Sequence, residues 1–453
     1  MSTYTYDLVI VGAGTGNMLP TEKFEGWRIA IVEGNRFGGT CLNRGCIPSK
    51  MFVLTADIAQ TIREAGRFGI SAQLTGVDWA AIRSRVFARI DPLHESAVTY
   101  RRANGIDVFI GDGRFAAPGV LRVGDDELRS RYFLLAAGSR PSIPPIPGLA
   151  ETPYVTSDDV MRLDTLPKSM VVLGGGFIGA EMSHVFGALG THVTIIGRDG
   201  HLLPRHDADV QARFTERYQK RFDLRLNATV ERVSATGNGV MLDLTTPSGP
   251  QQAKAEVLLV AAGRTPNSDR LNLEAAGVAV DPHGHVRTDH TYATSAPGVF
   301  AIGDLANHFQ LKHMANAEAK LAFHNLLHPE QPRRASFPVV PSAVFADPQV
   351  ASAGATEQQL KAAQRPYIAA TRSYGDTAYG WALQDTTSFV KVLADPGSRL
   401  ILGVHILGPQ AATLIQPLIQ AMCLGNTVDE VARGVLYIHP ALTEAVEQCL
   451  LEL

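Results

Sequence analysis

A strand, a glycine-rich turn and a second strand occur twice in this chain, and this repeated unit limits the folds open to it. A strand, a glycine turn and a strand that ends in an acid are typical of a dinucleotide-binding domain, in which the acid accepts ribose hydroxyls. The first copy consists of the apolar run 6–11, the glycines Gly12, Gly14 and Gly16, the apolar run 28–32, and Glu33.

The first copy departs from the usual pattern after its second glycine. Asn17 stands where a third glycine is usual, and Pro20 follows shortly after it. We therefore expect the first helix to be short or irregular, so that the pyrophosphate of the ligand relies less on a helix dipole than usual.

The second copy has all of its glycines but lacks the acid. Its runs are 170–173 and 192–196, and Gly174, Gly176 and Gly179 lie between them. Gly197 follows the second run, with Arg198 and Arg205 close by. An acid at this place repels a 2′-phosphate, whereas an arginine offers it a bidentate cation, so the second unit is predicted to bind NADPH rather than NADH.

A second internal similarity supports the duplication and helps to divide the chain. FLLAAGSRPS at 133–142 resembles LLVAAGRTPN at 258–267, and proline clusters at 141–148 and 331–341 mark boundaries. After the second cluster, the β-rich runs 389–393 and 400–408 predict an antiparallel hairpin. Helical patterns follow at 411–424, 428–433 and 440–451, so the last third is predicted to be an α+β domain.

Composition excludes several classes of protein. The chain has 453 residues, with 41 Lys and Arg against 44 Asp and Glu, so it lacks the basic field that nucleic acid requires. No apolar run reaches the ~18 residues of a membrane span, and the first residues do not form a signal peptide, so a cytoplasmic protein is expected. Four cysteines are too few for a secreted disulfide framework.

Two of these cysteines, Cys41 and Cys46, are separated by four residues just after the first glycine unit. A disulfide that closes so small a loop stabilises a fold by only about 2 kcal/mol, which makes a purely structural role a poor explanation. The spacing also lacks the CxxC pattern of metal sites, and no metal is expected. A redox-active pair beside a cofactor remains.

Near the C-terminus, His439 is followed by Pro440, and Glu444 lies five residues after the histidine. A carboxylate that orients and charges an imidazole is what a general acid or base requires. We interpret this pair as catalytic. Cys423 and Cys449 have no thiol neighbour in sequence and are interpreted as structural.

The segment GGTCLNRGCIPSK, at 38–50, resembles the redox-disulfide signature of the flavoprotein disulfide reductases, the group that contains glutathione reductase and dihydrolipoyl dehydrogenase. The resemblance covers the whole chain and implies FAD at the first unit and NADPH at the second. TSAPGVFAIGD, at 294–304, resembles the second FAD motif of the family, and HPALTE, at 439–444, resembles its HPTxxE motif with Ala441 in place of threonine.

The resemblance also implies individual roles. Cys41 would attack the substrate disulfide, Cys46 would face the flavin, Lys50 would lie near the flavin N5 with Glu181 as its partner, and His439 would reach the active site of a second subunit, which implies a homodimer. The expected FAD residues are Gly12, Gly14, Gly16, Glu33, Thr40, Lys50, Gly138 and Asp304, and the expected NADPH residues are Gly174, Gly176, Gly179, Arg198, Arg205 and Gly263.

The implied fold is α/β, with two doubly wound dinucleotide-binding domains, the second inserted in the first, and an α+β dimerisation domain. The expected boundaries are 1–148 and 272–334 for the FAD domain, 149–271 for the NADPH domain, and 335–453 for the dimerisation domain.

Three functions remain open at this point: a reductase of a small disulfide of the glutathione type, a dihydrolipoyl dehydrogenase, and a non-catalytic flavoprotein that signals to a partner. The last leaves the cysteine pair and the His439 motif without a purpose. The segments 52–70, 85–92, 374–386 and 414–422 resemble a branch of the family whose substrate is the disulfide of a pseudo-disaccharide thiol. Such a substrate carries few charges, whereas glutathione disulfide carries several carboxylates and requires arginines.

Overall fold

The computed structural model describes residues 2–453, and its N-terminal sheet contains the first glycine unit. The strands lie in the order β3-β2-β1-β6-β5-β4, and β16 also pairs with β6. β1, β2, β3, β6 and β16 are parallel, whereas β4 and β5 form an antiparallel meander with β6. Their bounds are β1 Ser2–Val11, β2 Ile29–Glu33, β3 Asp107–Ile110, β4 Gly113–Ala117, β5 Val120–Val123, β6 Asp126–Leu135 and β16 Val299–Ala301.

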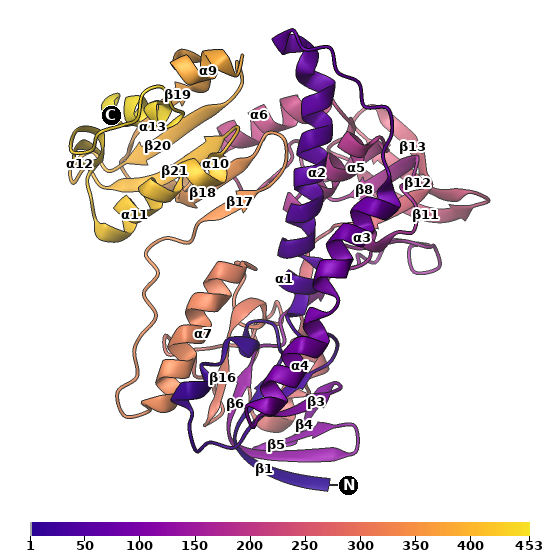
Figure 1. Ribbon diagram of the computed structural model, residues 1–453, viewed down its shortest axis with the longest axis vertical. Helices are drawn as coiled ribbons and strands as arrows, with labels where there is room; N and C mark the ends of the chain where they lie inside the picture. The colour runs from indigo at the N-terminus through magenta and orange to yellow at the C-terminus, as the bar shows by residue number, and fades with distance from the viewer. Residues whose placement is uncertain (1) are drawn as a thin grey trace.

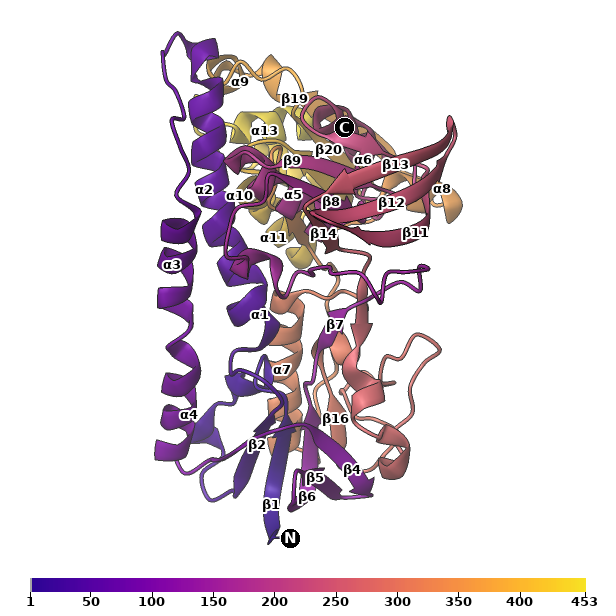
Figure 2. The ribbon, with the colours of Figure 1, turned by 90° about the vertical axis from the view of Figure 1, so that its right-hand side faces the viewer.

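The chain leaves this sheet after β6 and returns to it at β16, which is the order expected for an inserted domain. The helices of this part are α1 Gly39–Arg44, α2 Cys46–Glu64, α3 Trp79–Ile90, α4 Leu93–Ala103 and α7 Lys312–Leu327. α2 and α3 run side by side along one flank of the molecule (Figures 1 and 2).

The second glycine unit forms a parallel sheet of its own, in the order β10-β9-β8-β14, with a separate antiparallel sheet β11-β12-β13 beside it. The two similar segments, 133–142 and 258–267, are joined by a short antiparallel pair of strands, β7 and β15. The bounds are β7 Ser139–Pro141, β8 Ser169–Leu173, α5 Phe177–Leu189, β9 His192–Ile196, α6 Ala208–Gln219, β10 Asp223–Arg225, β11 Thr229–Thr236, β12 Gly239–Thr246, β13 Gly249–Ala255, β14 Val257–Val260 and β15 Arg264–Pro266.

The C-terminal part is built on an antiparallel sheet in the order β17-β18-β21-β20-β19. The predicted hairpin is confirmed, because β20 and β21 pair directly. The bounds are β17 Ser342–Val344, β18 Val350–Gly354, α8 Glu357–Ala362, β19 Ile368–Ser373, α9 Ala378–Ala382, β20 Phe389–Ala394, β21 Ile401–Leu407, α10 Ala411–Leu414, α11 Gln416–Leu424, α12 Val428–Arg433 and α13 Thr443–Leu451.

Two helix predictions in this part are wrong in detail. The helix predicted at 411–424 is divided at Ile415 into α10 and α11, because Pro417 has no N–H to continue the hydrogen-bond ladder. The last helix begins at Thr443 rather than at 440, because Pro440 and Ala441 belong to the turn that carries His439. The predicted architecture of two doubly wound units and an α+β domain is confirmed.

The helix α2, which begins at Cys46 and is called the redox helix below, lies where the N-terminal part, the second glycine unit and the C-terminal part meet. Phe52 on α2 belongs to the same buried cluster as Phe186 on α5 and Val344 on β17, and all three are at most 2 % exposed. Burial of such large apolar side chains is worth about 1.5–3 kcal/mol each, so this cluster holds the N-terminal turn of α2 against the second unit. Within residues 2–453, no helix is both long and apolar enough to span a membrane.

Candidate active site

Cys41 and Cys46 lie on the two sides of a break between α1 and α2. Cys41 is in the middle of α1, and Cys46 is the first residue of α2. Gly45 allows the break, since a Cβ on this residue would lie 3.0 Å from the Thr40 carbonyl oxygen. Thr40 therefore packs against Gly45, beside the two thiols. The two sulfur atoms are within hydrogen-bond reach of each other.

The two thiols are electrostatically unequal. The hydrogen bond that Cys41 donates lowers the pKa of Cys46 to about 7, and the Cys46 backbone N–H and the Lys50 ammonium act in the same direction. The same hydrogen bond, followed by burial, raises the pKa of Cys41. Cys46 also lies at the N-terminus of the long helix α2, where a thiolate is favoured. In the reduced pair, Cys46 is the thiolate and Cys41 is the thiol.

Lys50 follows Cys46 by one turn of α2, so both side chains lie on the same face of the helix. The Lys50 Nζ is 2.7 Å from both carboxylate oxygens of Glu181, which is buried on α5. Glu181 also accepts a hydrogen bond of 3.0 Å from the backbone N–H of Phe345, and the Lys50 ammonium lies 4.4 Å from the centre of the Phe345 ring. The pair therefore joins α2, α5 and the loop after β17.

The first glycine loop packs closely against the protein on several sides, so its glycines leave no room for side chains. Gly12 has φ +107°, and a Cβ on it would lie 2.3 Å from the Ala136 carbonyl oxygen. A Cβ on Gly39 would lie 2.7 Å from the Gly14 Cα, so the loop and the redox segment are in direct backbone contact. A Cβ on Gly16 would lie 2.6 Å from the Ile10 side chain, so this glycine serves packing.

Glu33 is held at the end of β2, beside this loop. Its carboxylate accepts hydrogen bonds from the backbone N–H groups of Ala13, at 2.7 Å, and Asn35, at 2.9 Å. Burial raises the pKa of this carboxyl group. Each carboxylate oxygen retains a free lone pair, so the site fits the ribose hydroxyls of FAD.

Gly138 follows β6 and Asp304 follows β16, and because these two strands pair in parallel, the segments after them meet at the same edge of the sheet. The Ser139 hydroxyl donates to the Asp304 carboxylate at 2.6 Å, and the buried Arg264 donates to the Ser139 hydroxyl at 2.8 Å. Gly138 has φ +67°, and no atom lies within 4 Å of the Cβ it would carry. This open, polar corner also fits FAD.

In the second unit, the three glycines have three different roles. A Cβ on Gly174, which has φ +134°, would lie 2.3 Å from the Ala261 carbonyl oxygen, and a Cβ on Gly179 would lie 2.2 Å from the Gly174 carbonyl oxygen. Gly176 is the N-cap residue of α5, and no atom lies within 4 Å of the Cβ it would carry. The space beside Gly263 is open in the same way. The tight turn, the open approach and the close helix packing are those of a dinucleotide site.

Arg198 and Arg205 are exposed residues of the segment between β9 and α6, and Gly197 is buried just after β9. Within the part of the chain that the structure describes, no carboxylate lies within 4 Å of either guanidinium. Both are therefore free to bind a phosphate.

His439 and Glu444 form a hydrogen bond of 2.7 Å between Nδ1 and Oε1, and the histidine side chain is 71 % exposed. The structure does not bring this pair to the thiols of the same chain. α12 and α13, which flank the segment, lie on the side of the C-terminal part that faces away from α1 (Figure 1). The preceding residues Val435, Leu436 and Ile438 are also exposed, which suits an interface.

The sequence did not single out three residues that support the site. Glu318, buried on α7, accepts from the Gly303 backbone N–H at 2.6 Å and so holds the turn before Asp304, and burial raises its pKa to about 7. Nothing distinguishes this glutamate from other helical glutamates in the sequence. Arg264 belongs to the segment 258–267, whose similarity to 133–142 is a sequence signal that could have identified it. Phe345 acts through its backbone N–H and its ring, and no sequence pattern marks these contacts.

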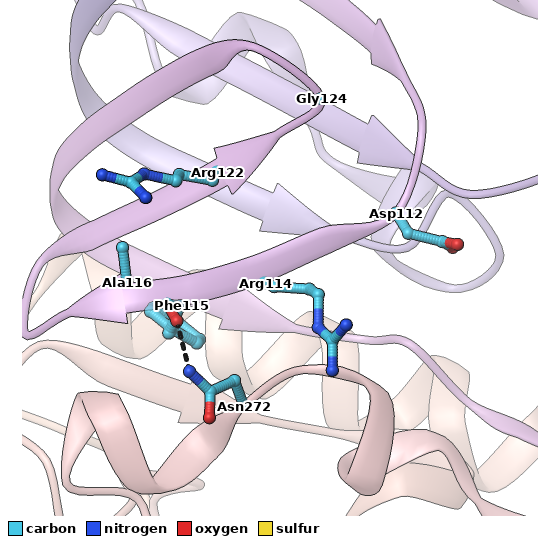
Figure 3. A pocket seen from close by; sticks show the side chains of 7 residues that line it. All are labelled: Asp112, Arg114, Phe115, Ala116, Arg122, Gly124 and Asn272. Atoms are coloured by element: carbon cyan, nitrogen blue, oxygen red, sulfur yellow. Dashed lines mark hydrogen bonds between the residues drawn. The ribbon is translucent and has the colours of Figure 1, made fainter.

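A separate surface hollow of about 610 Å³ lies at the edge of the β4–β5 meander, where Arg114 and Arg122 project from neighbouring strands (Figure 3). It contains none of the residues predicted for the site. Among residues 2–453, no group of three or more His, Cys, Asp or Glu side chains is arranged to hold a metal ion.

Comparison with known proteins agrees with this geometry. Residues 6–319 match the family described as pyridine nucleotide-disulphide oxidoreductase, and residues 340–450 match its dimerisation domain. Mycothione reductase of Mycobacterium tuberculosis is 46% identical over 99% of both chains. Dihydrolipoyl dehydrogenase of Halobacterium salinarum is 31% identical over 97% of this chain and 94% of its own.

Among solved structures, the Cu(II) complex of the HOCl-induced flavoprotein disulfide reductase RclA from Escherichia coli superposes with a TM-score of 0.87 at 27% identity, and the match covers 99% of both chains. FAD and NADPH, which the resemblance implies for the two glycine units, are cofactors that enzymes of this family use, and the dimerisation domain supports a homodimer. This chain is an enzyme of the pyridine nucleotide-disulphide oxidoreductase family.

Proposed function

We propose that this enzyme reduces mycothione, the disulfide of mycothiol, to two molecules of mycothiol at the expense of NADPH. The observation that carries the proposal is the 46% identity, over 99% of both chains, to a relative named mycothione reductase. The identity to a dihydrolipoyl dehydrogenase is lower, at 31%.

The arginines of the segment 38–50 and of the far end of α2 also favour a substrate with few charges. Arg63 on α2 donates to the Ala188 carbonyl, and Arg67 lies 3.7 Å from Glu64 and stacks on Phe68. Arg44, beside the thiols, is paired with Asp158 at 3.0 Å. Each of these arginines already has a partner, so none is an obvious ligand for the carboxylates of glutathione disulfide.

The chemistry at the substrate begins with a proton transfer. Because the Cys41 thiol has a raised pKa, it needs a base, and His439 of the partner subunit, oriented by Glu444, is the candidate. The Cys41 thiolate attacks one sulfur of the substrate, the substrate S–S bond breaks, and the leaving thiolate takes the proton from the histidine.

The Cys46 thiolate then attacks the Cys41 sulfur, the mixed disulfide breaks, and the Cys41–Cys46 disulfide forms as the second thiolate leaves and takes a proton from solvent. A bound FAD would supply the two electrons of NADPH that reduce this disulfide to the thiols. Lys50, held by Glu181, keeps a positive charge beside the Cys46 thiolate.

The remaining residues would hold the cofactors. Glu33 would bind the FAD ribose and Asp304 its ribityl chain, with Gly12, Gly14 and Gly138 allowing close approach. Arg198 and Arg205 would bind the 2′-phosphate of NADPH, above the loop of Gly174, Gly176 and Gly179. Since NADPH chemistry and free thiols belong to the reducing cytosol, the proposed location is the cytoplasm.

The test is to measure kcat/KM side by side for the disulfides of mycothiol, glutathione and lipoamide with NADPH as the reductant. We expect mycothione to exceed the other two by at least about 100-fold, because buried polar groups of a matched site reject the wrong substrate strongly. A larger kcat/KM for glutathione disulfide or lipoamide would overturn the choice of substrate and leave the disulfide chemistry in place.

A further inference from the structure

The first glycine loop of this chain is not followed by an α-helix. Residues 16–18 and 21–23 form only single 3-10 turns before β2 begins at Ile29, in agreement with the prediction from Asn17 and Pro20. In the second unit, by contrast, Gly176 directly caps the 13-residue helix α5. The partial positive charge that a helix N-terminus offers a pyrophosphate is therefore missing from the first unit.

A buried arginine from another helix occupies the space behind this loop. Arg101, near the end of α4, is 6 % exposed. Its guanidinium donates to the backbone carbonyl of Asn17, to the Asn17 side-chain oxygen at 2.8 Å, to the Leu19 carbonyl at 3.3 Å and to the Thr21 hydroxyl at 2.7 Å. One side chain thus holds the backbone groups that a helix would have paired internally.

A lysine approaches the same loop from the other side. Lys312 is the first residue of α7, and its Nζ donates to the Thr15 hydroxyl at 3.0 Å. The 3-10 turn at 16–18 packs against α7, and the loop lies between α7 and α4 (Figure 1). The ammonium has three donors, of which Thr15 uses one, so two remain for a ligand.

Neither cation has a carboxylate partner in the structure. Within residues 2–453, no carboxylate oxygen lies within 4 Å of the Arg101 guanidinium or the Lys312 ammonium. Burial lowers the pKa of both groups, and Cys41, Cys46 and Asp304 act against this shift at Lys312. A cation that is removed from water without a counter-ion is unfavourable, and two of them beside one loop indicate that an anion belongs there.

We propose that Arg101 and Lys312 replace the missing first helix in binding the FAD pyrophosphate. Arg101 is a positioning residue, which holds the loop from Asn17 to Thr21 in shape and supplies positive potential. Lys312 is a binding residue, which directs its free donors to the anion. The proposal rests on the FAD that the family uses and not on the choice of disulfide, so its test needs no substrate.

The test measures the dissociation constant of FAD, which is followed by the change in flavin fluorescence when FAD binds to the protein. The variants are Lys312→Met and Arg101→Met, with Lys320→Met on α7 and Arg102→Met on α4 as matched controls, because both control residues are exposed. We expect the dissociation constant of FAD to rise by about 10-fold or more in each of the two variants and to stay within about 2-fold of wild type in the controls.

The salt dependence of FAD binding separates an electrostatic role from a structural one. If the two cations face the pyrophosphate, removal of either one makes the dissociation constant less sensitive to ionic strength, whereas a distorted loop weakens binding without changing this sensitivity. Should Arg101→Met fail to fold, Arg101→Lys keeps the charge and loses part of the hydrogen bonding, and we expect it to retain the wild-type salt dependence.

Wild-type FAD affinity in Lys312→Met, or an unchanged salt dependence in both methionine variants, would overturn the proposal. A failure of mycothione reduction would not affect this result, because the FAD measurement contains no disulfide substrate.

Discussion

The ammonium of Lys50 lies 2.7 Å from both carboxylate oxygens of Glu181, and this ion pair joins the redox helix α2 to the helix α5 of the second glycine unit. The glutamate is buried and also accepts from the Phe345 backbone, so the pair fixes three parts of the chain at one point. A charge held so firmly beside Cys46 can influence both the thiolate and the electron transfer that re-reduces it.

We expect Glu181→Gln to slow the reduction of the bound flavin by NADPH and to lower the free energy of unfolding by about 1–3 kcal/mol, because the lysine then lacks its anionic partner. Stopped-flow absorbance and thermal denaturation measure the two effects. Glu216→Gln is the control, since Glu216 pairs with Lys220 on the surface, where both side chains are more than half exposed. Equal behaviour of the two variants would contradict the role assigned to Glu181.

The pKa of Cys46 predicts a pH dependence of its reactivity. Because this pKa is lowered to about 7, the thiolate in the reduced enzyme is lost as the pH falls through 7. The stability that the lowered pKa contributes is complete only above the unfolded-state pKa of about 8.5 and is lost as the pH falls from there through 7. Alkylation of Cys46 by iodoacetamide, followed residue by residue with mass spectrometry, should slow below pH 7. The hydrogen bond from Cys41 is the main cause, so Cys41→Ala should move the midpoint upward, and an unmoved midpoint would refute this cause.

We predict that the preference for NADPH depends on Arg198 and Arg205, in the segment after β9. We expect Arg198→Ala to raise the KM for NADPH by about 10-fold or more and to leave the KM for NADH nearly unchanged, because only the 2′-phosphate requires the cation. Arg232→Ala, at another exposed arginine of the same part of the chain, is the control. A proportional loss with both nucleotides would count against the assignment.

The exposed His439 predicts an active site that is shared between subunits. In dimers assembled from equal amounts of Cys41→Ser and His439→Ala chains, half are hybrids, and each hybrid has one site with both residues intact. We expect about a quarter of the wild-type activity from this mixture, although each variant alone is inactive. No recovery after mixing would mean that Cys41 and His439 of the same chain act together.

The features that the sequence predicted correctly are those that depend on short spacing. The two strand–glycine–strand units and the hairpin of β20 and β21 follow from local patterns, and so does the irregular segment after Gly16. The helix predicted at 411–424 is wrong in detail because Pro417 interrupts the hydrogen-bond ladder within an otherwise continuous apolar pattern.

The parts of the site that could not be predicted from spacing are contacts between distant residues. Lys50 meets Glu181 across 131 residues, Ser139 meets Asp304 across 165, and Arg101 meets Asn17 across 84. Such pairs are decided by how helices pack on sheets, and a lone glutamate or arginine in a helix carries no local mark of its partner. The position of His439 depends on a second subunit, so neither the local pattern nor a single chain determines it.

In the proposed reaction, Cys41 attacks the substrate and Cys46 resolves the mixed disulfide that forms on Cys41. Mass spectrometry of the Cys46→Ser and Cys41→Ser variants after incubation with mycothione distinguishes these two roles. We expect Cys46→Ser to accumulate one mycothiol as a mixed disulfide on Cys41, because the resolving thiol is absent, and Cys41→Ser to accumulate none. A stable adduct on Cys46 in the Cys41→Ser variant, with none on Cys41, would contradict it.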